Sequence, residues 1–192
     1  MGAPDWKKFD GYVYPTLSAE EQSFLDHEVE HLCGLLNEWE IHHHLKDLPV
    51  EAWQYIKEQS FLGLIIPKEY GGRAFSSFAQ SRIMSKISSR SLTTAVSCMV
   101  PNSLGPGELL LHYGTEEQKS KYLPDLISAK SIGAFGLTEA DAGSDSAKIN
   151  TSVRKNGEGY SLNGTKLFTT NAKEADVFVI IANQDPQFDR KG

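Results

Sequence analysis

The chain has 192 residues, of which 40% are hydrophobic and 23% are charged, values that suit a globular protein with one large domain or two small ones. Its formal net charge is -6, which argues against a nucleic-acid-binding or polybasic membrane-binding protein, since both need a basic surface. The two cysteines, Cys33 and Cys98, have the spacing of neither a disulfide framework nor a zinc site, which favours a reducing compartment.

Residues 17–130 have the periodicity of helices. Ser18 and Glu21 form a capping-box pattern, and Thr115 and Gln118 form a second one. After the first box, a single apolar stripe is made by Phe24, Leu25, Val29, Leu32 and Leu36. Further helices are expected over residues 49–63, 77–89, 92–99, 106–113 and 115–122, with a new turn beginning at Pro124.

From residue 132 the periodicity becomes that of strands, with a short buried strand at 132–137 and a fully buried one at 177–182. Asn156-Gly157 and Asn163-Gly164 are hairpin-turn signals. We therefore predict an α+β fold, in which an N-terminal α-helical domain (1–130) precedes an incomplete antiparallel β-barrel-like domain (131–192). The last strand runs into a polar turn with no closing partner, so we expect the β domain to be truncated.

The loop after the first strand, residues 135–145, combines small residues, hydroxyls and turn formers. Backbone N–H groups around Gly143 and Ser144 could form an anion-binding nest, and Gly143 leaves room for a phosphate. Thr138 places a hydroxyl at the end of the strand. The alternative is an acidic surface turn.

A second segment, residues 162–171, joins a tight turn to an aromatic residue and two threonines. A flat heteroaromatic ring needs an apolar face to pack on and hydroxyl or amide groups at its edge. The alternative is an ordinary hairpin made of β-forming residues.

Together the two segments read TE-x-x-AGSD at 138–145 and NG-x-K-x-F-x-TN at 163–171, and two further motifs lie upstream at 64–72 and 102–124. Their order and spacing resemble those of the acyl-CoA dehydrogenases. The stretch 101–110 resembles the large bacterial long-chain fatty acyl-CoA dehydrogenases in particular. We therefore expect a cytoplasmic bacterial protein, and membrane association of a longer parent protein stays open.

The resemblance implies that the chain binds FAD. The implied cofactor contacts are Phe135, Leu137, Thr138, Gly143, Ser144, Phe168, Thr169 and Thr170. Among them, Thr138 would bond the pyrimidine edge of the flavin and Thr170 would lie near its N5 atom. Ser144 would also contact the CoA arm of the substrate, and Val100 and Leu104 would line the acyl channel.

This sequence departs from the family pattern at a few positions. Ala140-Asp141 stands where Pro-Gly is frequent, Phe168 where Trp is usual, and Ala172 where Gly is usual. Phe168 still offers a flat apolar face for the flavin. The extra charge of Asp141 lies near the place expected for an anionic diphosphate.

The implied reaction is the α,β-dehydrogenation of a fatty acyl-CoA, with proton abstraction by a carboxylate and hydride transfer to the flavin. In the family the base belongs to a C-terminal helical domain, so neither Glu139 nor Glu174 is assigned that role and no catalytic residue is predicted here. We expect the 192-residue chain alone to be inactive and to bind FAD weakly or not at all. The implied partners are fatty acyl-CoA, an electron-transfer flavoprotein and further copies in a dimer or tetramer.

Two alternatives keep the same fold: an acyl-CoA oxidase, which oxygen consumption would reveal, and a non-catalytic binding subunit. A metal reading of His42-His43-His44 is weaker, because three consecutive helical residues point in different directions and no carboxylate or cysteine completes a ligand set. No metal site is predicted.

Overall fold

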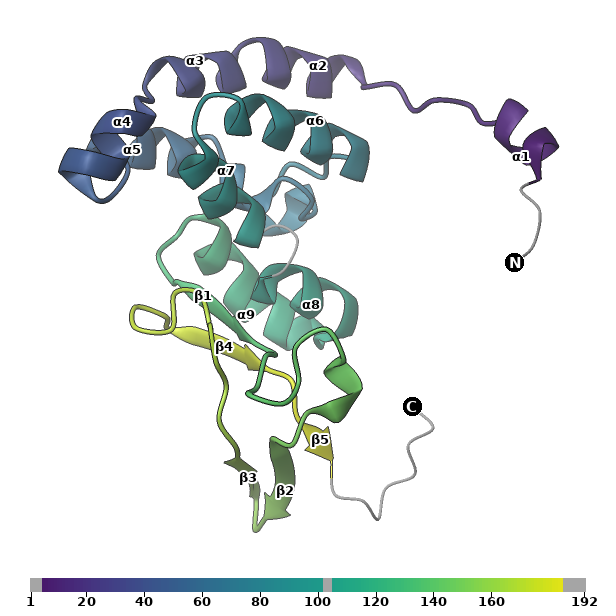
Figure 1. Cartoon of the computed structure of the whole chain (residues 1–192), viewed down its shortest axis with the longest axis vertical. Helices are drawn as coiled ribbons and strands as arrows, with labels where there is room; N and C mark the ends of the chain where they lie inside the picture. Colours follow the sequence, from purple (N-terminus) through teal and green to yellow (C-terminus); the bar gives the residue numbers. More distant parts are fainter. Residues whose placement is uncertain (1–4, 102–104, 185–192) are drawn as a thin grey trace.

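The computed structural model describes residues 5–101 and 105–184, and all its α-helices lie in the first two-thirds of the chain (Figure 1). The helices, with η for 3-10 and π segments, are α1 (Trp6–Asp10), α2 (Ala19–Asp26), α3 (Glu28–Gly34), α4 (Glu38–Glu40), η1 (Ile41–Leu45), α5 (Val50–Glu58), η2 (Phe61–Gly63), η3 (Lys68–Tyr70), α6 (Ser77–Ser88), α7 (Leu92–Met99), α8 (Pro106–Tyr113), α9 (Glu116–Ile127) and η5 (Ser146–Lys148). The strands are β1 (Gly133–Gly136), β2 (Ser152–Asn156), β3 (Gly159–Asn163), β4 (Val177–Ile180) and β5 (Asn183–Gln184).

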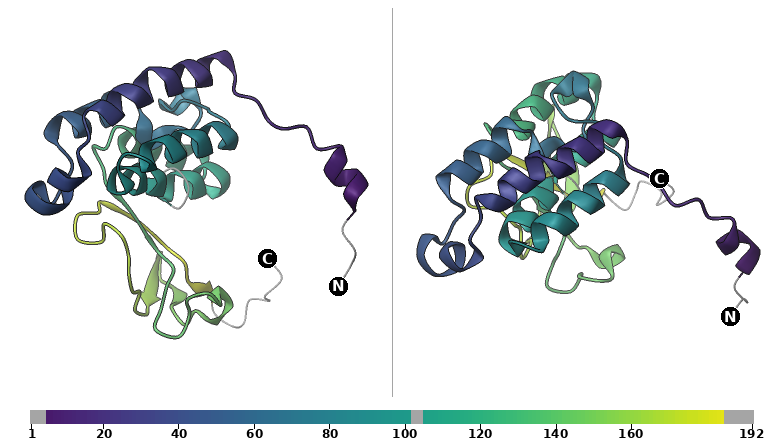
Figure 2. Two further views of the ribbon diagram at one scale, coloured as in Figure 1. Left: turned by 45° about the horizontal axis from the view of Figure 1, so that its top comes forward. Right: turned by 90° about the horizontal axis from the view of Figure 1, so that it is seen from above.

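The helical part has one main core, formed by α2, α3, α5, α6 and α7. The predicted stripe from Phe24 to Leu36 is confirmed as buried, although α2 and α3 meet at His27 and Leu36 lies just after α3 rather than on one continuous helix. Figure 2 shows α1 held away from this core on an extended segment. Within the described ranges, no helix is long and apolar enough to cross a membrane.

The two predicted capping boxes are both present. The Glu21 N–H donates to Ser18 Oγ at 3.2 Å, and the Ser18 N–H donates to Glu21 Oε2 at 2.7 Å. Each box satisfies backbone N–H groups that the first helical turn leaves without a partner.

Replacing Ser18 with alanine is expected to lower the free energy of unfolding by about 1 kcal/mol, because the first turn of α2 loses its side-chain acceptor. Denaturant unfolding of the complete gene product measures this loss. Ser81→Ala is the matched control, since Ser81 is an exposed residue inside α6 and is expected to change stability little. Equal effects of the two substitutions would show that the cap contributes nothing.

The prediction that the last helix ends near Tyr122 is wrong, because α9 continues through Pro124 to Ile127. Inside a helix, proline removes one backbone donor and its ring crowds the carbonyl of residue i−4, at a cost of about 3 kcal/mol. Burial offsets that cost here, since Leu123 and Ile127 on either side of Pro124 are 0% and 4% exposed and form the second apolar cluster with Ile66.

The strands form two small sheets rather than the predicted antiparallel barrel. β1 pairs with β4 in parallel, with Gly133 opposite Val177 and Gly136 opposite Ile180. β2 pairs antiparallel with β3 and parallel with β5. The antiparallel prediction holds only for β2 and β3, because the partner of each other strand comes from a distant part of the chain.

The two Asn-Gly signals have different outcomes. Asn156-Gly157 does form the β2–β3 hairpin, where Gly157 supplies the positive φ of 62° that the tight turn requires. Asn163-Gly164 ends β3 without making a hairpin, and Leu167 and Phe168 are not in a strand. The predicted strand 177–182 is shorter, as β4, and only partly buried, with Phe178 47% exposed.

Candidate functional site

The two segments predicted to hold a flavin lie side by side. The Leu167 N–H donates to the Thr138 carbonyl oxygen at 2.8 Å, and Lys166 Nζ donates to the Leu137 carbonyl oxygen at 2.9 Å. Segment 135–139 leaves the end of β1, and segment 163–170 follows β3. The two segments, which are far apart in the sequence, are therefore close enough to contribute to one ligand site.

Glu139 is the buried centre of this region. Its Oε1 accepts hydrogen bonds from Lys166 Nζ at 2.7 Å and from the Thr151 N–H at 2.9 Å, as well as from the Thr151 hydroxyl. Its Oε2 accepts the Asn150 N–H at 2.6 Å. The Lys166 and Glu139 side chains are only 9% and 7% exposed. The pair therefore ties the first flavin segment both to the second and to the residues that lead into β2.

The hydrogen bond from Lys166 lowers the pKa of the Glu139 carboxyl most, and the hydrogen bonds from Thr151 and Asn150 lower it further, to about 2. Glu139 is ionised at neutral pH and its lone pairs are occupied. Such a carboxylate is a poor proton acceptor, which agrees with leaving it without a catalytic role.

The predicted flavin contacts differ in exposure. Phe135, Leu137, Thr138 and Thr169 are half-buried, whereas Gly143, Ser144 and Thr170 are exposed. Phe168 is 91% exposed and has a left-handed backbone with φ 55°. An aromatic ring held in solvent by a sparsely populated backbone conformation points to a functional constraint.

The threonine hydroxyls at these positions are available for a ligand. Within the described part of the chain, those of Thr138, Thr169 and Thr170 have no hydrogen-bond partner. Neither Gly143 nor Ser144 has a positive φ, so no αR–αL nest is formed at this pair. A side chain at Gly143 would meet nothing within 4 Å, so the space above it is open.

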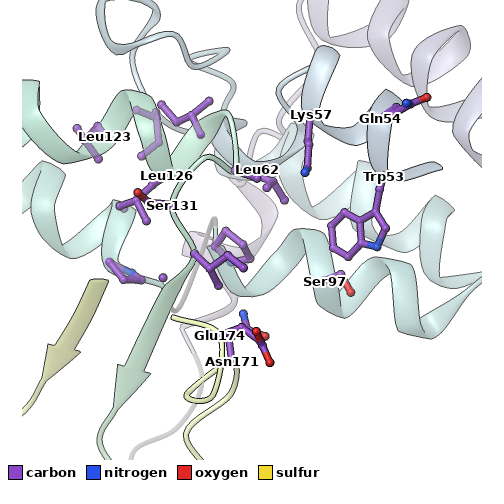
Figure 3. Close-up of a pocket in the computed structure, with 18 of the residues that line it drawn as sticks. Trp53, Gln54, Lys57, Leu62, Ser97, Leu123, Leu126, Ser131, Asn171 and Glu174 are labelled. Carbon is purple, nitrogen blue, oxygen red and sulfur yellow. The ribbon is translucent and has the colours of Figure 1, made fainter. Parts of the chain in front are cut away.

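An apolar cavity of about 610 Å³ lies between the helices and the start of β1, where Ile132 and Gly133 line it (Figure 3). Its apolar wall includes Leu62, Ile66, Pro101, Pro106, Leu123 and Ile127. In Figure 3, Trp53 and Lys57 reach its rim from α5, and Asn171 and Glu174 reach it from the segment before β4. The volume is within the range of about 300–1,000 Å³ that is usual for small-molecule sites.

The predicted channel residues are only partly placed. Val100 is half-buried at the end of α7, and its neighbour Pro101 lines the cavity. Leu104 lies outside the described residues. Glu174 lines the cavity, although no sequence pattern indicates that position, and its Oε1 is 3.2 Å from Lys173 Nζ at the surface.

Among residues 5–101 and 105–184, no group of His, Cys, Asp or Glu side chains is arranged to hold a metal ion. His42, His43 and His44 lie on the π-helical segment η1, and the His43 ring stacks on Trp39 with 3.8 Å between centroids. The three histidines are thus part of an exposed helix end.

Family models match nearly the whole chain. Residues 16–130 match the acyl-CoA dehydrogenase N-terminal domain, and residues 134–192 match the acyl-CoA dehydrogenase middle domain. The chain belongs to the acyl-CoA dehydrogenase family.

Curated relatives from this family differ in substrate. A 3-(aryl)acrylate reductase of Clostridium sporogenes is 34% identical over 171 residues, covering 89% of the chain and 44% of the relative. The human mitochondrial very long-chain specific acyl-CoA dehydrogenase is 35% identical over 179 residues, covering 89% of the chain and 27% of the relative. The chain thus spans less than half the length of these two proteins.

Solved structures agree with the family assignment. An acyl-CoA dehydrogenase of Bacillus anthracis complexed with FAD superposes with a TM-score of 0.76 at 32% identity, covering 91% of the chain and 30% of that protein. A prolyl acyl carrier protein oxidase superposes with a TM-score of 0.76 at 29% identity, covering 90% and 46%. The same fold therefore serves dehydrogenases and an oxidase.

Proposed function

We propose that this chain forms the flavin- and acyl-binding part of an enzyme that oxidises fatty acyl-CoA thioesters to trans-2-enoyl-CoA. One observation carries the proposal. The segment from Phe168 to Glu174 begins at an exposed aromatic ring beside the end of β1 and runs to the wall of the apolar cavity. A ring-binding surface and an apolar site for a chain are thereby joined by one short segment.

The residues present fit FAD. The Phe168 ring provides an apolar face, the free hydroxyls of Thr138 and Thr170 can bond the polar edge of a ring system, and the open space at Gly143 admits a phosphate. When bound, FAD would supply the redox chemistry. The role of the chain is to orient the ring and to exclude water from the acyl chain.

The cavity fits the acyl part of the substrate. Its lining is mainly apolar and includes a few polar side chains such as Lys57 and Asn171, as expected of a site that takes an alkyl chain and has a few polar groups to orient the ligand. Pro101 from the end of α7 and Asn171 from the second flavin segment both line it, so an acyl chain can run from the flavin towards the helices. We propose no base from this chain and assign that role to another part of the complete protein.

Anaerobic titration of the complete gene product with acyl-CoAs from butyryl- to stearoyl-CoA tests this function. We expect a protein that carries FAD and whose oxidised flavin absorbance is bleached by at least one chain length, with enoyl-CoA as the product. A flavin-free protein, or a flavin that no acyl-CoA reduces, would contradict the proposal.

Experiments on the same flavin-loaded protein distinguish a dehydrogenase from an oxidase and from a binding subunit. Similarity to a prolyl acyl carrier protein oxidase favours oxidation by O₂ as the second candidate. Reoxidation of the reduced flavin by oxygen with consumption of O₂ indicates an oxidase, whereas reoxidation only by an electron-transfer flavoprotein indicates a dehydrogenase. FAD that binds acyl-CoA without bleaching indicates a binding subunit.

The domain boundary between residues 130 and 131 and assembly into a dimer or tetramer remain part of the proposal. Light scattering of the complete gene product measures the second.

A further inference from the structure

We propose that Lys166 is a positioning residue, whose ion pair with Glu139 sets the register between the two flavin segments. The inference rests on the proposed function, because it assigns the pair a role in holding the site for FAD. Neither side chain is expected to touch the substrate.

The contacts of Lys166 join successive residues of both segments. Its Nζ bonds the Leu137 carbonyl at 2.9 Å and Glu139 Oε1 at 2.7 Å, while the next residue, Leu167, bonds the Thr138 carbonyl at 2.8 Å. Residues 137, 138 and 139 are therefore each tied to residue 166 or 167. A slip of one residue between the segments would break all of these contacts.

The stem of Lys166 lies directly against β1. A Cβ atom added at Gly136 would be 3.3 Å from Lys166 Cγ, so the absence of a side chain there lets the lysine cross the strand end. With its stem packed and its ammonium buried, Lys166 can hold only a narrow range of positions. That restriction is passed on to Leu167 and Phe168, which follow it in the chain.

Glu139 anchors the pair to the second sheet through the N–H groups of Asn150 and Thr151. Buried ion pairs contribute little net stability compared with apolar pairs of similar size, and their better-attested use is to specify one arrangement. Thr138 and Thr170 have no hydroxyl partner in the described chain, so their own side chains do not fix their separation. The Glu139–Lys166 pair, which is next to Thr138 in the chain and close to Thr170, fixes that separation instead.

The test compares FAD dissociation constants and flavin visible circular dichroism for the complete gene product and three variants. Lys166→Met removes the cation and leaves Glu139 buried without it. Glu139→Gln combined with Lys166→Met removes both charges and keeps one acceptor oxygen, which can serve the N–H of either Asn150 or Thr151. Lys68→Met, which breaks an exposed 2.8 Å pair with Glu20, is the matched control.

We expect Lys166→Met to weaken FAD binding about tenfold or more and to lower the melting temperature of the flavin-free protein. The double variant is expected to regain most of that melting temperature but not the FAD affinity, and its flavin dichroism should stay altered. Lys68→Met should bind FAD as the wild type does.

Recovery of both melting temperature and FAD affinity in the double variant would show that the pair serves stability alone and would overturn the inference. So would a double variant that does not fold, or unchanged FAD binding in Lys166→Met. A wild-type protein without FAD affinity would instead overturn the proposed function, and this inference with it.

Discussion

Gly164→Ala is expected to lower the free energy of unfolding by about 1–3 kcal/mol and to weaken FAD binding, because the new Cβ has no room. It would lie 2.7 Å from both Cα and Cβ of Thr151. Thr151 cannot retreat freely, since its N–H and hydroxyl bond Glu139 and its carbonyl accepts the Asn183 N–H at 2.8 Å. The added methyl group must therefore displace the residue that holds Glu139.

Gly143→Ala is the matched control for the effect of Gly164→Ala on stability. Gly143 lacks a positive φ and has no atom within 4 Å of an added Cβ, so stability should change by less than about 0.5 kcal/mol. FAD affinity should nevertheless fall if a phosphate lies against Gly143. Denaturant unfolding and FAD titration of both variants separate the two effects. A Gly164→Ala protein as stable as the wild type would show that residues 151 and 164 are not in close contact.

Glu21→Gln is expected to lower the free energy of unfolding at pH 7 by on the order of 2 kcal/mol. Glu21 is 7% exposed, and its two oxygens accept the N–H groups of Ser18 and Ser76, each at 2.7 Å. Burial acts to raise the pKa of this carboxyl, but the hydrogen bonds from Ser18 and Ser76 outweigh it and lower the pKa from 4.5 to about 2. Glu21 therefore links the start of α2 to the start of α6 only when it is ionised.

The pH dependence follows from this direction of the shift. Because the folded-state pKa lies below the unfolded-state value, the stabilising contribution of Glu21 is complete above pH 4.5 and is lost as the pH falls towards 2. The stability difference between wild type and Glu21→Gln should shrink over that interval. Unfolding curves at pH 7, 4 and 3 measure it. A difference that stays constant with pH would mean that the carboxylate charge plays no part.

Local features of this fold could be predicted from the sequence. The capping boxes at Ser18 and Thr115 depend on residues three positions apart, and both predictions are confirmed. Helices α6, α7 and α8 also begin and end close to the predicted residues, since their limits are set by serine caps, by proline and by Gly114. Such signals do not depend on how the rest of the chain packs.

Strand pairing could not be predicted in the same way. After the β2–β3 hairpin the chain returns to the end at which β1 begins, so β4 runs parallel to β1. No residue close in sequence specifies that return. The alternating pattern of 132–137 indicates a strand but not the direction of its partner. The barrel-like antiparallel arrangement was inferred from the turns, and only the Asn156-Gly157 turn formed a hairpin.

The Glu139–Lys166 pair is not predicted by the sequence patterns, although both residues lie in the two flavin motifs. The two residues are 27 positions apart, and the pattern of each loop alone does not indicate the other as its partner. One signal is present in the sequence: the two motifs are expected to meet around one ligand, the charged residues of 138–145 are all acidic, and the only charged residue of 163–171 is Lys166. Charges that enter a largely apolar site from two segments are expected to pair.

The exposed Phe168 ring also bears on how the protein behaves in solution. Together with Leu167, which is 37% exposed, it forms a small exposed apolar patch at the place where the cofactor is proposed to lie. Two flavin-free molecules can associate through such apolar patches, whereas a flavin that covers the ring would prevent this contact. If the flavin covers this ring as proposed, we expect removal of the flavin to increase aggregation, which light scattering of the protein with and without FAD would measure.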